Sequence, residues 1–65
     1  MRADQLTVAH EGRVLVTGTG SQRRRATLRT VDLTHSTYVL AIVDDPVRGR
    51  TPVVLAPDTE IGIED

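Results

Sequence analysis

The chain has 65 residues, a formal net charge of −1 and no cysteine, which excludes disulfides and thiolate metal sites. This length predicts one domain, residues 1–65, that buries only about 60% of its unfolded surface, so we expect self-association to add to its thin core. No stretch approaches the roughly 20 apolar residues that span a bilayer, and we therefore expect a soluble, cytoplasmic protein with no membrane partner.

The first segments in chain order are predicted to be two short strands joined by a turn. The chain holds nine Val and nine Thr but only one aromatic residue, and β-branched residues favour strands. Residues 5–9 and 13–18 are predicted as the strands, with His10, Glu11 and Gly12 as a hairpin turn between them. A short helix that begins at Asp4 and ends at Gly12 is the alternative for the first segment.

Residues 17–22 form a loop, since two glycines and a serine leave little to pack. Residues 23–32 alternate as a strand does, with Ala26, Leu28 and Thr30 on one face. Val31 and the arginines at 25 and 29 then lie on the other face. The pattern predicts a strand with a cationic exterior.

Residues 36–44 form the most apolar segment, and the segment is apolar on both faces. Because side chains alternate along a strand, Val39, Ala41 and Val43 face one side and Tyr38, Leu40 and Ile42 face the other. The core of so small a domain can bury only one face of this strand, so we expect a second copy of the chain to bury the other face. The candidate oligomer interface is Tyr38, Val39, Leu40, Ala41, Ile42 and Val43.

The remaining segments are a turn at residues 45–49 and strands at 50–56 and 60–65. Pro52 cannot donate a ladder hydrogen bond, which places its strand at an edge or a bulge. Ile61 and Ile63 share one face of the closing strand. The chain is therefore predicted to be all-β with five or six short strands, closed as a small SH3-like or Sm-like barrel because closure removes sheet edges.

Residues 14–40 resemble the first motif of the Sm-like family in the order of their strands, turns and key residues. The residues that carry this resemblance are Val14, Val16, Gly20, Leu28, Val31, Asp32 and the run Tyr38 to Leu40. Ala26 stands where the motif has glycine, and Ser36 or Thr37 stands where it has asparagine. The family's second motif is not matched, because Ala56 and Pro57 stand in place of its Arg-Gly. The resemblance implies a barrel that forms homo-oligomers through edge strands.

A cluster of arginines is the most unusual feature of the sequence. Residues 13–50 carry seven arginines and three aspartates, whereas residues 51–65 carry four acidic residues and no base. The arginines can neutralise phosphates, and two rings can stack on bases, so RNA or single-stranded DNA is a candidate partner. The candidate nucleic-acid site is Arg23, Arg24, Arg25, Arg29, His35 and Tyr38. The alternative is that the arginines pair with Glu60, Glu64 and Asp65 of the acidic tail.

No pattern in the sequence predicts catalysis, a cofactor or a metal. His10 and His35 lack the spacing of metal ligands and are expected in turns. Asp44 and Asp45 are neighbours in a strand, so their side chains point to opposite faces. We therefore expect no enzyme but a small homo-oligomeric β-barrel module that binds a protein partner. Nucleic-acid binding through residues 23–29 and a structural accessory role in a larger assembly are the alternatives.

Overall fold

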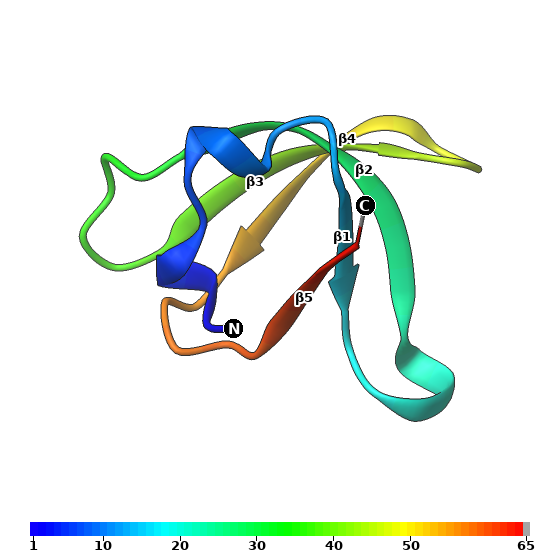
Figure 1. The fold of residues 1–65 in the computed structure, drawn as a ribbon, viewed down its shortest axis with the longest axis horizontal. Helices are drawn as coiled ribbons and strands as arrows, with labels where there is room; N and C mark the ends of the chain where they lie inside the picture. The colour runs from blue at the N-terminus through cyan, green and yellow to red at the C-terminus, as the bar shows by residue number, and fades with distance from the viewer. Residues whose placement is uncertain (65) are drawn as a thin grey trace.

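The computed structural model describes residues 1–64, which form one five-stranded antiparallel sheet in the order β4-β3-β2-β1-β5 (Figure 1). The strands are β1 (Val14–Thr17), β2 (Arg24–Asp32), β3 (Val39–Asp45), β4 (Gly49–Leu55) and β5 (Ile61–Glu64). Three 3-10 turns, η1 (Ala3–Gln5), η2 (Val8–His10) and η3 (Gly20–Gln22), complete the described elements. The prediction of an all-β chain is confirmed. Within the described part, no helix is long and apolar enough to cross a membrane.

The prediction of a closed barrel is wrong. β4 and β5 are the two edges of the curled sheet, and within residues 1–64 no ladder joins them. The N-terminal segment forms backbone hydrogen bonds with the link between β4 and β5 and with the start of β5, beside which it lies in Figure 1. The Ala3 N–H donates to the Thr59 carbonyl at 2.8 Å, and the Ile61 N–H donates to the Met1 carbonyl at 2.7 Å. The N-terminus is thus held between the edges where a barrel would close.

The N-terminal strand predicted over residues 5–9 is also wrong, and so is its hairpin turn. The segment makes local hydrogen bonds, from the Leu6 N–H to the Ala3 carbonyl at 3.1 Å and from the His10 N–H to the Thr7 carbonyl at 3.0 Å. Ala3 and Leu6 are fully buried while Val8 is 71% exposed, so these two buried side chains and not the β-branched residues decide the conformation. The alternative of a helix from residue 4 to residue 12 is replaced by η1 and η2.

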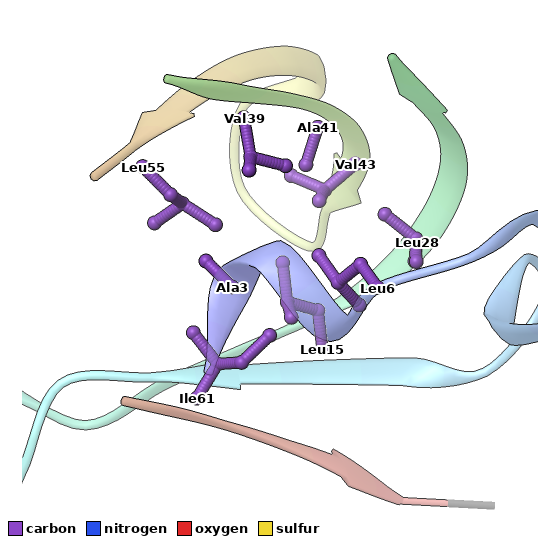
Figure 2. Close-up of a cluster of buried hydrophobic side chains, with 9 residues drawn as sticks. All are labelled: Ala3, Leu6, Leu15, Leu28, Val39, Ala41, Val43, Leu55 and Ile61. Atoms are coloured by element: carbon purple, nitrogen blue, oxygen red, sulfur yellow. The ribbon is translucent and has the colours of Figure 1, made fainter. Parts of the chain in front are cut away.

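The core lies on the inner face of the sheet, where the N-terminal segment fills the space between the strands (Figure 2). Leu6 and Leu28 are its two largest fully buried side chains. No polar side chain is buried among the described residues. The core cluster is Ala3, Leu6, Leu15, Leu28, Val39, Ala41, Val43, Leu55 and Ile61.

A β-bulge at Arg29 changes which residues of β2 face the core. Leu28 pairs with Val43, but the next pair is Thr30 with Ile42, so Arg29 has no opposite residue. Val31 consequently packs against the core and Thr30 is exposed, the reverse of the predicted alternation. A bulge bends its strand, and β2 curves strongly across the sheet (Figure 1).

Candidate functional site

The outer face of β3 and β4 carries the part of the predicted interface that is open to a partner. Val39, Ala41 and Val43 are at most 4% exposed and face the core of the same chain, so their side chains do not lie on its surface. Leu40 and Ile42 are only partly buried and lie on the opposite face.

Two residues of the edge strand β4 extend this outer surface. Val54 lies opposite Leu40, and Pro52 lies opposite Ile42, in the β3–β4 register. Directly opposite side chains on one face of an antiparallel pair are about 4.5–5.5 Å apart at Cβ, so the four side chains form one block. Val54 is 66% exposed and Pro52 is also exposed. We call Leu40, Ile42, Pro52 and Val54 the outer apolar patch.

A wide hollow of about 770 Å³ adjoins the outer apolar patch, and Ile42 and Pro52 line both. Its other lining residues include Arg29, Arg50 and Glu11. The Glu11 carboxylate accepts a hydrogen bond from the Val31 N–H at 3.2 Å, which ties the chain before β1 to β2. The surroundings of the patch therefore carry charges of both signs.

Two of the predicted nucleic-acid arginines pair with carboxylates of the same chain. Arg25 Nε lies 3.2 Å from Glu64 Oε1, and Arg29 Nη1 lies 3.3 Å from Asp44 Oδ2. All four side chains are about half exposed, and such pairs contribute at most about 1 kcal/mol each. The predicted pairing with the acidic tail is confirmed for Glu64. Glu60 instead accepts a hydrogen bond from the Met1 amino group at 2.9 Å, and Asp65 lies outside the described residues.

The other two arginines point to different faces of the sheet. Arg24 lies opposite Thr17, two residues from the core-facing Ala26, and is therefore on the inner face. Arg23 lines a hollow on the outer face with Val16 and Gly62. No carboxylate lies within ion-pair distance of Arg23 or Arg24 in the part of the chain that the structure describes. The four arginines do not form a single cationic face.

The two predicted stacking rings stack on each other. The ring centroids of His35 and Tyr38 are 4.3 Å apart with an interplanar angle of 15°. His35 Nε2 also lies 3.4 Å from Asp32 Oδ2. Hydrogen bonds from the Thr34 hydroxyl and the Thr34 N–H lower the pKa of Asp32. Each ring thus covers one face of the other.

Asp44 and Asp45 serve separate structural roles, as their alternation predicts. Asp44 pairs with Arg29, whereas Asp45 Oδ1 accepts hydrogen bonds from the N–H groups of Val47 at 2.8 Å and Arg48 at 3.0 Å. These two bonds and, to a lesser extent, the positive charges of Arg48 and Arg24 lower the pKa of Asp45. Among residues 1–64, no three His, Asp or Glu side chains lie together as a metal site would require.

A cleft of about 220 Å³ opens on the inner face, between the β1–β2 strands and the β3–β4 hairpin. We call it the inner cleft. Its apolar walls are Leu15, Ala26, Val43, Pro52 and Val53, so Pro52 borders both this cleft and the outer apolar patch. Its polar lining is Thr17, Arg24, Asp45, Arg48 and Thr51. Sequence reasoning missed this cleft, although Arg24 shares its parity in β2 with Ala26 and Leu28, which is the signal that could have placed Arg24 inside.

Comparison with known proteins gives no relative for this chain. No protein-family model, no curated protein and no solved structure matches it. The resemblance to Sm-like proteins therefore depends on the sequence motif in residues 14–40.

Proposed function

We propose that the chain is a non-catalytic interaction module that forms a homo-oligomer through its outer apolar patch and in that form binds a protein partner. The observation that carries the proposal is the block of four apolar side chains on the outer face of β3 and the edge strand β4. Contiguous apolar surface of this kind is typical of association sites. A chain this small also has a thin core, so burial of apolar surface against a second copy adds substantially to its stability.

A face-to-face arrangement fits this surface better than edge-to-edge pairing of strands. Pro52 lies in the edge strand β4 and has no N–H to donate, and proline on an edge opposes the addition of another strand. In a twofold dimer the same patch serves both copies. Charges of both signs surround the patch, so a second copy meets no large field of one sign.

We further assign the open sheet to the SH3-like and Sm-like type of small barrel. The motif in residues 14–40 supports this assignment, and so does a strand order in which β5 lies beside β1. In that order, β4 and β5 are the two edge strands, and pairing between them would close the sheet into a barrel.

The test is the molar mass of the full chain by light scattering, compared with the variants Val54→Asp and Val47→Asp. Val54 is 66% exposed in the patch, and burying it in an interface is worth about 1–2 kcal/mol per copy. Val47 is 92% exposed in the β3–β4 turn and is the matched control. We expect a multiple of 7.1 kDa for the wild type and for Val47→Asp, and a folded monomer for Val54→Asp. A folded wild-type monomer at every concentration overturns the proposal.

The second candidate is binding of RNA or single-stranded DNA along residues 23–29. The supporting observation is that neither Arg23 nor Arg24 has a carboxylate within ion-pair distance among residues 1–64, although the charge of Arg24 does interact with that of Asp45. This candidate predicts that a labelled oligonucleotide binds at low salt and that affinity falls as salt rises. Replacement of both Arg23 and Arg24 by Gln must weaken that binding, and absence of any anisotropy change at low salt removes the candidate.

A further inference from the structure

The inner cleft has the construction of a small binding site. Its walls reach the core, because Leu15 and Val43 belong to the buried cluster. Its lining residues all come from the first four strands and the β3–β4 turn, so the N-terminal segment does not fill it. A volume of about 220 Å³ equals roughly seven water volumes of 30 Å³ each, which suits a ligand of about seven to nine heavy atoms.

The mouth of the inner cleft favours a negative charge. Arg24 and Arg48 line it, and neither guanidinium has a carboxylate within ion-pair distance among the described residues. Asp45 is the one acidic residue in the lining; its Oδ1 accepts hydrogen bonds from the N–H groups of Val47 and Arg48, and its charge also interacts with the charges of Arg48 and Arg24. Two guanidinium groups against one carboxylate leave a net positive charge where a ligand enters.

We infer that the inner cleft binds a small free carboxylic acid with an apolar body of about five or six carbons. A guanidinium group offers paired N–H donors that match the two oxygens of a carboxylate. The walls contributed by Leu15, Ala26 and Val53 then take the hydrocarbon body out of water. The cleft is smaller than the pockets of about 300–1,000 Å³ that usually hold drug-sized ligands, so most of such a ligand would remain outside it.

The test is a titration of the isotope-labelled full chain with 4-methylpentanoate, followed by the amide resonances of the cleft. We expect shifts centred on Thr17, Thr51 and Val53. The uncharged 4-methylpentanamide lacks the carboxylate, and acetate lacks the hydrocarbon body. Each should bind at least about tenfold more weakly, since a hydrogen bond to a charged group and a buried apolar body each contribute more than about 1.4 kcal/mol.

Variants connect the binding to this cleft and keep folding separate from it. Arg24→Gln and Arg48→Gln should each weaken 4-methylpentanoate binding about tenfold, with resonance dispersion showing that both variants fold. Arg23→Gln is the matched control, because Arg23 is next in sequence but lies on the outer face. The variant Val54→Asp should bind as the wild type does, so this inference stands or falls independently of self-association.

Three results overturn the inference. If acetate binds as tightly as 4-methylpentanoate, the arginines attract the carboxylate but the apolar walls contribute nothing to binding. Unchanged affinity in both Arg24→Gln and Arg48→Gln places the ligand elsewhere. A peptide that ends in leucine and binds where the free acid does not assigns the cleft to a polypeptide C-terminus in place of a small acid.

Discussion

Replacement of Leu6 by alanine tests whether the N-terminal segment is part of the core. Leu6 is fully buried among strand residues although it lies outside the sheet (Figure 2). Truncation of a fully buried leucine to alanine costs about 2–5 kcal/mol, the range set by how far the site collapses. A core of this size supplies only about 3–5 kcal/mol of net stability. Leu6→Ala should therefore lose most or all of the folded state at 25 °C.

The assay is urea denaturation followed by circular dichroism, at one protein concentration because the apparent stability of a self-associating chain depends on its concentration. Val8→Ala is the matched control, since Val8 lies in the same segment and is 71% exposed. Its free energy of unfolding should stay within about 0.5 kcal/mol of the wild type. A Leu6→Ala variant as stable as Val8→Ala would refute the claim that the segment completes the core.

Two further predictions concern the turns. The pKa of Asp45 is lowered from 3.8 by the N–H groups of its turn, so its contribution to stability is present above the unfolded pKa and is lost as pH falls through the lowered folded value. The urea midpoint of the wild type should therefore exceed that of Asp45→Asn near neutral pH, and the difference between the two midpoints should shrink as the pH is lowered. A difference that does not change with pH would contradict this prediction. Gly18 has φ +78° and a Cβ there would collide with the Gln22 carbonyl, whereas Gly49 has φ +77° and open space around it. Both alanine variants should be destabilised by at least about 1 kcal/mol, because alanine disfavours the left-handed backbone. Gly18→Ala should lower the melting temperature further than Gly49→Ala because of the collision, and equal losses would contradict this.

Local pattern was sufficient to predict β1 to β5 and the turn between β3 and β4. Alternation also separated Leu40 and Ile42 from the core-facing residues of β3, and Pro52 correctly indicated that β4 lies at an edge. These features depend on neighbours in sequence and on one residue type at a time. Two residues of the outer apolar patch, Leu40 and Ile42, were therefore predicted from the sequence. The other two, Pro52 and Val54, are identified by the register of β3 against β4.

The errors arose where distant parts of the chain meet. The conformation of residues 3–10 depends on the burial of Ala3 and Leu6 among strands that come later in the chain, which no local propensity reports. The bulge at Arg29 is a property of the β2–β3 register and reverses the alternation that follows it. Arg48 was assigned to a turn alone, because its position at the mouth of the inner cleft depends on how the hairpin faces β1 and β2.

The most direct test of self-association through the outer apolar patch is a dilution series of amide spectra, from millimolar to micromolar chain. The patch interface predicts concentration-dependent shifts centred on Leu40, Ile42 and Val54, absent in Val54→Asp and present in Val47→Asp. Shifts confined to β5, or spectra that do not change on dilution in a folded monomer, would contradict the proposed interface.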